Sequence, residues 1–504
     1  MRTLALWRLF ARLLHGDRAC GPVRRRQPNR AFRLVATAAK PLVLSPAGRL
    51  SRIVGDGPIA VMLAGVMLLS MLGETHATAG FPEAQGRGRE AQGGRGGWVI
   101  EVANLNDSGP GSLRACVLET GPRNCIFRVS GVIVLTRSLL IDGEKSAFLS
   151  IYGQTAPGLG ITITVDPNST SFMQTPLIVR NTHDVIVQNI RSRSQAPKTT
   201  ENVDAVTVEE SRRVIVDHVS GSWATDENVN TQGQATDITI SHSIFGEGLR
   251  VHSKCALLGS DGTGPQSISF WRNLCISNND RNPDLNFYAG SCIDIVDNLF
   301  YNARSEWAEI FSQKPGGTTA SLIGNYFKAG PSTLPLTYAI NFNPIQSVAF
   351  PSLFLLDNAA WAPGDKTLEL IAPDTTRFIA EAPACSPGVE TYGDAVVTYH
   401  RVLAEAGAFP RDGVDARLIR QVGVIGSPGK GELRSSPGTI TPIEQAKPYT
   451  DEDRDGMADT AEARFGATAG VSDGWTGLDE NGQTRFDRFM HWLMAERMAA
   501  RYPD

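Results

Sequence analysis

A small group of oxygen-bearing side chains in the middle of the chain has the composition of a calcium site. It consists of the carboxylates of Asp204, Asp226 and Glu227, with the amides of Asn202 and Asn230 close by. Ca²⁺ takes 6–8 oxygen ligands, including waters, and can therefore keep positions open for a further carboxylate. Asp204 and Asp226 are 22 residues apart, close to one period of the repeat described below, so stacking would bring them together. The alternative is a solvated acidic rim or a salt bridge at a corner of the fold.

A second group of carboxylates near the C-terminus matches the 12-residue EF-hand loop at every liganding position. Gly456 stands at position 6, where the loop turns sharply. The expected ligands are the carboxylates of Asp451, Asp453, Asp455, Asp459 and Glu462 and the main-chain carbonyl of Met457. An amphipathic segment over 484–496 predicts a helix, so residues 450–504 are interpreted as a small calcium-binding tail with a structural role. The alternative is an acidic linker.

The elements that would position the central group are short alternating strands that recur along the chain. The clearest are Val185–Asn189, Val214–His218, Ile238–His242, Ile268–Arg272, Ile293–Asp297 and Ala320–Gly324. Their closing residues are spaced by 29, 24, 30, 25 and 27 residues. Repeats of this length cannot bury an apolar face alone and must stack. Strands rich in β-branched residues, joined by turns without helical periodicity, predict an all-β fold, a right-handed parallel β-helix, for residues 98–425.

Some polar residues recur at one corner of the predicted coils. Asn273, Asn298 and Asn325 directly follow the last three closing residues and are expected to form a stacked column. His218 and His242 are themselves closing residues. Although histidine can act as a general base, this register favours turn-capping or stacking for both of them.

Composition and charge limit the remaining possibilities. The chain has 504 residues, 41% of them hydrophobic, which is enough for a large core, and its formal net charge of -4 gives no indication of nucleic-acid binding. Residues 80–97 and 426–449 are rich in Gly with Arg, or with Pro and Ser, and are predicted to be linkers. A helical pattern within 393–421 predicts a helix that caps the outside or an end of the stack.

The N-terminal 79 residues have the pattern of an export signal. Residues 1–53 are rich in Arg, residues 57–73 carry no charge, and Ala77 and Ala79 form an A-x-A site after which cleavage is expected. The uncharged run is short for a membrane span, so we expect a secreted protein without a stable membrane anchor. Export permits disulfides, and we predict one between Cys116 and Cys125 across a turn-rich segment. The later cysteines Cys255, Cys275, Cys292 and Cys385 are interpreted as buried free thiols.

Several motifs in order resemble the pectate lyase superfamily over about residues 98–425. They are Gly153–Gly158 (GQTAPG), Asn202–Asp204, Asp217–Glu227 (DHVSGSWATDE), His252–Asp261 (HSKCALLGSD) and Arg281–Pro283 (RNP). The resemblance implies a parallel β-helix that cleaves acidic pectic chains by calcium-dependent β-elimination. Some calcium-ligand positions that are acidic in that family are amides here, which implies weak affinity before substrate arrives.

The resemblance also implies roles for two basic residues. Lys254 matches a substrate-binding lysine that would neutralise the uronate carboxylate. Arg281 matches the arginine that takes the proton, a role that needs a lowered pKa, so we expect an alkaline optimum. Without the resemblance, Lys254 would be interpreted as a surface lysine, and Arg281 as the partner of Asp280 or Asp284 in a salt bridge.

The chain departs from the family pattern just after Arg281. Where the family commonly has R-x-P-R-x-R, this sequence has Arg281-Asn-Pro-Asp284-Leu-Asn286, with one cation missing and one acid gained. Arg250, Arg272 and Arg304 are candidates to compensate.

The expected partner is therefore an acidic polysaccharide such as pectate, the expected cofactor is Ca²⁺, and the expected state is a monomer. Two rival functions stay open at this point: a non-catalytic β-helix that binds uronate glycans, and a β-helix glycoside hydrolase. The hydrolase would need an Asp-Asp pair and a G-H-G segment, and the sequence contains neither.

Overall fold

The structure is a computed structural model that describes residues 78–196, 201–250 and 252–504. The predicted signal region, apart from Thr78 and Ala79, lies outside the described residues. Within the described part of the chain, no helix has the length and apolar character needed to cross a membrane.

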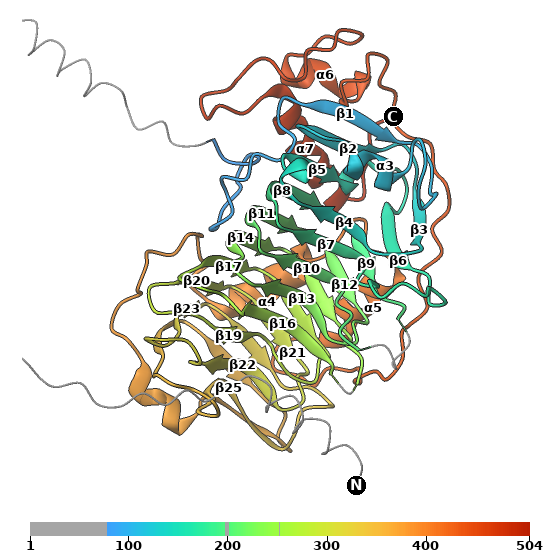
Figure 1. The fold of residues 1–504 in the computed structure, drawn as a ribbon. Helices are drawn as coiled ribbons and strands as arrows, with labels where there is room; N and C mark the ends of the chain where they lie inside the picture. The colour runs from blue at the N-terminus through green and yellow to red at the C-terminus, as the bar shows by residue number, and fades with distance from the viewer. Residues whose placement is uncertain (1–77, 197–200, 251) are drawn as a thin grey trace, which may run out of the picture. The chain divides into compact units, whose positions relative to one another are not determined.

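Residues 98–371 form a parallel β-helix with three sheets, in which every pairing between named strands is parallel (Figure 1). Sheet A contains β1 (Trp98–Val102), β2 (Arg123–Phe127), β5 (Leu149–Tyr152), β8 (His183–Gln188), β11 (Arg212–Asp217), β14 (Thr236–Ser241), β17 (Ser267–Trp271), β20 (Cys292–Val296), β23 (Thr319–Ile323) and β26 (Ser352–Leu356). Sheet B contains β3 (Gly131–Leu135), β6 (Ile161–Val165), β9 (Arg191–Arg193), β12 (Ser220–Ser222), β15 (Ile244–Gly246), β18 (Leu274–Ile276), β21 (Leu299–Tyr301), β24 (Tyr326–Lys328) and β27 (Ala359–Trp361). Sheet C contains β4 (Leu139–Asp142), β7 (Leu177–Arg180), β10 (Val206–Glu209), β13 (Glu227–Gln232), β16 (Lys254–Ser260), β19 (Asp284–Asn286), β22 (Glu306–Phe311), β25 (Leu336–Phe342) and β28 (Thr367–Ile371). The parallel β-helix expected from the repeat is thus the observed fold.

The bend between sheets A and B explains the repeat in the sequence. Each closing residue has a positive φ, which turns the chain sharply before sheet B: Asn189 56°, His218 51°, His242 45°, Arg272 59°, Asp297 51° and Gly324 66°. The predicted asparagine column follows this bend. Asn273 Nδ2 donates to Asn298 Oδ1 (3.2 Å) and Asn298 Nδ2 to Asn325 Oδ1 (3.0 Å). The column therefore satisfies buried backbone and side-chain groups at every step.

Short helices lie on the outside of the coils or at their ends. They are α3 (Leu113–Leu118), α4 (Ala395–Glu405), α5 (Gly413–Val422), α6 (Asp459–Phe465) and α7 (Arg485–Met498), with the 3₁₀ helices η1 (Glu144–Ser146), η2 (Gly153–Thr155) and η3 (Pro373–Phe378). The predicted capping helix is a pair, α4 and α5. Tyr399 of α4 and Leu418 of α5 pack with Leu274 and Leu299 of sheet B in one buried cluster.

The segment 80–97 is not a free linker, contrary to the prediction. It lies along sheet A, where Gly88 N donates to Thr239 Oγ1 (2.9 Å) and Arg87 pairs with Asp294 (2.8 Å). A Cβ on Gly88 would lie 2.5 Å from the Val214 carbonyl oxygen. Its glycines therefore permit close approach to the sheet, a use of Gly that composition alone does not distinguish from flexibility.

The C-terminal tail packs onto the first coils of the β-helix. Phe486 and Phe489 of α7 share a buried cluster with Ile126 and Tyr152 of sheet A. Arg128, in the first coil, donates a hydrogen bond to the Tyr449 carbonyl oxygen (2.6 Å), and its guanidinium lies over the Tyr449 ring. In Figure 1, α7 accordingly lies beside β1, β2 and β5. The tail thus belongs to the same packed unit as the β-helix.

In the part of the chain that the structure describes, six cysteines form three disulfides. Cys116 is joined to Cys125, the pair expected from the sequence. The interpretation of the later cysteines as free thiols is wrong, because Cys255 is joined to Cys275 and Cys292 to Cys385. The fold explains the error. Stacking brings residues from different coils, and from the segment after the last coil, next to each other, and no short spacing in the sequence records this.

Candidate functional site

The three predicted carboxylates converge on the outer side of sheet C. Asp204 precedes β10, Asp226 precedes β13, and Glu227 is the first residue of β13. Their ligand atoms all lie within 4.8 Å of one another. Asp204 accepts hydrogen bonds from Thr207 Oγ1 (2.6 Å) and from the backbone N–H of Glu227 (3.1 Å). Neighbouring coils thus fix the group before any ion binds.

The two predicted basic residues lie on the next two coils. Lys254 begins β16 and is the register partner of Glu227. Its Nζ is 2.9 Å from Asp226 Oδ1 and 3.5 Å from Glu227 Oε1. Arg281 precedes β19, where its Nη1 bonds to Glu227 Oε1 and its Nε lies 3.0 Å from Asp284 Oδ2. Four successive coils therefore place three acids and two bases in one cluster.

The two amides behave differently. Asn230 is buried and its Nδ2 lies 3.4 Å from Asp204 Oδ2, while its Oδ1 has no hydrogen-bond partner among the described residues. Asn202 is exposed, and its side chain makes no hydrogen bond to these carboxylates in the part of the chain that the structure describes. The structure brings Asn230 into the site and leaves Asn202 outside it.

Burial and neighbouring like charges raise the pKa values of two of these carboxylates. Burial, with the charge of Asp226, raises the pKa of Asp204 to about 6. Burial and the charges of Asp204 and Asp226 raise the pKa of Glu227 to about 8, although Arg281 and Lys254 oppose the shift. Closely placed like charges in a poorly solvated site produce such shifts. A divalent cation would relieve them.

Burial and neighbouring charges have opposite effects on the pKa of Arg281. Burial lowers the pKa of its guanidinium, but the charges of Glu227 and Asp284 outweigh burial, and the net shift is upward. A role as a base would require a lowered pKa for Arg281. The neighbouring acids Glu227 and Asp284 instead raise the pKa of Arg281.

Further acids near Arg281 were not identified as part of the site in the sequence. Asp284 in β19 pairs in register with Glu309 of β22, and burial raises the pKa of Asp284 well above its usual value. Burial and the charge of Glu309 raise the pKa of Glu306 to about 7. Only the sheet register brings these residues together, so the sequence offered just one signal, the unexpected acid at position 284.

His252 also belongs to the cluster. Its Nδ1 is 3.6 Å from Asp226 Oδ1 and 3.3 Å from Lys254 Nζ. Arg272, considered as a replacement for the missing cation, lies on sheet A instead, between the rings of Trp271 (4.1 Å) and Tyr392 (4.0 Å). It cannot compensate in the cluster on sheet C.

The C-terminal loop forms a second group of acids. Ligand atoms of Asp451, Asp453 and Asp455 lie within 4.8 Å of one another. Gly456 has a φ of 92°, as the sharp turn at position 6 requires. Met457 is buried next to it. Asp459 Oδ1 accepts from the backbone N–H of Glu452 (3.0 Å).

Several oxygens of this loop have no protein partner. Glu462 is 1% exposed, and neither of its carboxylate oxygens has a hydrogen-bond partner among the described residues. The same holds for Asp451 Oδ1 and Asp453 Oδ2. Burial raises the pKa of Asp451 to about 7, and burial with the charges of its acidic neighbours raises the pKa of Glu462 to about 7. Buried carboxylate oxygens without donors fit a hard cation.

Comparison with known proteins agrees with the ordered motifs. A family model described as pectate lyase matches residues 56–306. A probable pectate lyase C from Aspergillus terreus is 34% identical over 443 residues, covering 86% of this chain and 99% of the relative. Its counterpart from Aspergillus flavus is 33% identical over 445 residues, covering 86% and 98%. The crystal structure of jun a 1, the major allergen from cedar pollen, aligns with a TM-score of 0.47 and 15% identity over 64% of this chain and 92% of that one. Matched along almost the whole length of these fungal relatives, this chain belongs to the pectate lyase family of polysaccharide lyases.

Proposed function

We propose that this protein is a secreted, calcium-dependent pectate lyase that cleaves polygalacturonate-type chains by β-elimination. The observation that carries the proposal is the cluster on sheet C, in which Asp204, Asp226 and Glu227 stand beside Lys254 and Arg281. The names of the fungal relatives support the same substrate class.

The residues that would hold Ca²⁺ are Asp204, Asp226 and Glu227, with Asn230 Oδ1 available beside them. All are hard oxygen donors, and their mutual repulsion favours a cation. Asn202 is exposed and would have to turn inward to join. When bound, Ca²⁺ supplies Lewis-acid polarisation of a uronate carboxylate.

The chain's own residues supply charge stabilisation and proton transfer. Removal of the C5 proton of a uronate spreads negative charge into its carboxylate, and the ammonium of Lys254 neutralises that charge. The guanidine of Arg281, when neutral, takes the C5 proton. The C4–O4 bond then breaks as the C4=C5 double bond forms, and the leaving oxygen takes a proton from water.

The decisive experiment follows the ultraviolet absorbance of polygalacturonate during incubation with the protein. A lyase makes a 4,5-unsaturated chromophore, so absorbance should rise with Ca²⁺ and stop when a chelator is added. Reducing ends without absorbance would identify a hydrolase, and retention of the polymer without either product would identify a binding protein. Either result would contradict the proposal.

We further propose that the C-terminal loop binds a structural Ca²⁺. Asp451, Asp453, Asp455 and Glu462 offer side-chain oxygens, several of them without partners, and the carbonyl of Met457 is expected to add another. Asp459, which bonds to the backbone of Glu452, would contribute through water. Calorimetry should show that the single variant Glu462→Gln binds one equivalent of Ca²⁺ fewer than the unmodified chain.

Secretion is proposed from the N-terminal pattern and supported by the three disulfides, which persist in oxidising compartments. The exported protein should begin at Gly80 and be a monomer. N-terminal sequencing and light scattering of the culture supernatant test both statements.

A further inference from the structure

A cluster of two histidines and an aspartate lies on sheet A, away from the acidic site on sheet C. Asp217 ends β11, His218 follows it, and His242 follows β14 on the next coil. The two imidazole rings are stacked, with centroids 4.8 Å apart and planes inclined by 8°. Neither histidine contributes to the proposed lyase reaction.

Asp217 orients both rings. It accepts hydrogen bonds from His218 Nδ1 (2.8 Å) and His242 Nδ1 (3.1 Å), one on each carboxylate oxygen. Ser241 Oγ (2.8 Å) and Gln188 Nε2 (3.1 Å) donate to the same carboxylate. An ionised carboxylate only accepts, so the proton of each neutral ring is on Nδ1. The lone pair of each ring is then on Nε2.

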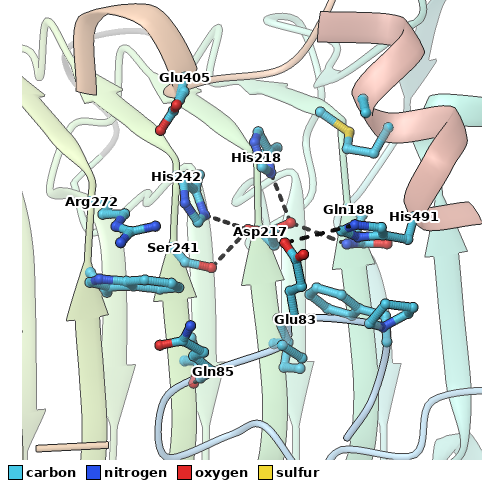
Figure 2. A pocket seen from close by; sticks show the side chains of 18 of the residues that line it. Glu83, Gln85, Gln188, Asp217, His218, Ser241, His242, Arg272, Glu405 and His491 are labelled. Carbon is cyan, nitrogen blue, oxygen red and sulfur yellow. Dashed lines mark hydrogen bonds and ion pairs between the residues drawn. The ribbon is translucent and has the colours of Figure 1, made fainter. Parts of the chain in front are cut away.

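The free edges of the rings face a pocket of about 680 Å³ that lies between sheet A, the segment 81–85, α4 and α7. Figure 2 shows the two rings side by side, with Asp217 on one side of them and Glu405 of α4 on the other. His218 is 7% exposed, and its Nε2 has no hydrogen-bond partner among the described residues. A buried nitrogen lone pair without a donor fits a ligand that accepts electrons.

We propose that His218 and His242 bind one divalent transition-metal ion of the zinc, cobalt and copper class through their Nε2 atoms. Imidazole nitrogens suit these ions and do not suit Ca²⁺. Histidines that bind metals usually donate their other ring N–H to a carboxylate, and Asp217 does this for both rings as a positioning residue.

Binding of one ion by both rings requires them to turn. Metal–nitrogen bonds of about 2.0–2.1 Å place two nitrogens at most about 4.2 Å apart, and a metal lies in the plane of the imidazole that binds it. The two ring planes are now almost parallel, inclined by 8° with centroids 4.8 Å apart, so both side chains must rotate until their planes meet at the ion. Glu405 of α4 lines the same pocket, where its carboxylate pairs with Arg401 (2.9 Å) and accepts a hydrogen bond from the Tyr392 hydroxyl (3.2 Å). The other positions would be open to water or to a ligand in the pocket.

Cobalt absorption tests the proposal on the full exported chain. The protein is stripped with a chelator, returned to millimolar Ca²⁺ so that the oxygen sites are filled, and titrated with Co²⁺. We expect one equivalent of Co²⁺ with visible bands of nitrogen ligation, displaced by Zn²⁺. His218→Ala and His242→Ala should each weaken binding at least about tenfold, and the double variant should abolish the bands. Asp217→Asn should weaken binding about tenfold.

His400→Ala is the matched control, because His400 is an exposed histidine of α4. It should leave the titration unchanged. Lyase activity and circular dichroism of the variants show whether they have folded, since the two histidines lie outside the cluster on sheet C. Absence of Co²⁺ binding to the unmodified chain, or equal bands in the double variant, would overturn the proposal.

Discussion

Lys254 is the residue whose removal tests the catalytic cluster most directly. Its side chain is 6% exposed and contacts Asp226 at 2.9 Å, where the developing charge of a uronate would also be neutralised. Lys254→Ala should lower kcat by about 100-fold or more, because donors aimed at transition-state charge have effects of that size. Lys145→Ala, an exposed lysine of η1, should have no effect in the same absorbance assay. Equal activity of the two variants would refute the role of Lys254.

Arg281 determines the expected dependence of activity on pH. Burial lowers the pKa of its guanidinium, but Glu227 and Asp284 raise it overall. Since only neutral guanidine can take a proton, activity should increase as the pH rises through the alkaline range. Asp284→Asn removes one of the acids that raise the pKa, so the rising limb should move to lower pH. A rate profile that peaks in the acid range would contradict the role of Arg281, as would a shift to higher pH in Asp284→Asn.

The calcium loop is an element whose acids should make stability depend on pH when no ion is bound. Burial raises the pKa of Asp451 to about 7, whereas an unfolded Asp titrates near about 3.9. The folded state then binds more protons than the unfolded state between these values, so stability falls as pH rises from about 4 to about 7. Ca²⁺ takes the place of those protons. The melting temperature of chelated protein should therefore fall over this range, and Ca²⁺ should restore it most at the upper end.

Matched variants separate this effect from that of the cluster on sheet C. Asp451→Asn should reduce both the pH dependence and the Ca²⁺-induced rise in melting temperature. Asp204→Asn should keep the contribution of the loop while losing lyase activity. If chelation leaves the melting temperature unchanged at pH 7, the loop does not have a structural calcium ion.

The elements were predictable where the same pattern returns once per coil. A short alternating strand closed by a polar or small residue recurs along the sequence, and Asn273, Asn298 and Asn325 follow the last three of these closing residues. Convergence of Asp204 with Asp226 followed from their spacing of one coil. The disulfide of Cys292 with Cys385 did not, because it joins a coil to a segment that returns from beyond the stack. The pairing of Glu227 with Arg281 depends on side-chain contacts across coils, which spacing does not determine.

At the scale of the whole molecule, the three disulfides should stabilise the fold unequally. They join cysteines that are 9, 20 and 93 positions apart in the sequence. The loss of chain entropy in the unfolded state grows with loop length, so removal should cost about 2.5, 3.5 and 4.5 kcal/mol respectively. Serine replacements of Cys125, Cys275 and Cys385 should follow this order in denaturant unfolding. The reverse order would show that native-state packing outweighs loop length.

The packing of the tail against the first coils also has a consequence for association between molecules. A parallel β-helix ends in edge strands, and β1 is the edge strand of sheet A; edge strands can pair with another chain. Ile126 of β2 and Tyr152 of β5, the two strands that follow β1 in sheet A, pack against Phe486 and Phe489 of α7. If bound calcium holds α7 against these strands, removal of the ion would expose their apolar side chains beside the edge strand. Protein treated with a chelator should then form oligomers at temperatures where the calcium-bound protein remains monomeric.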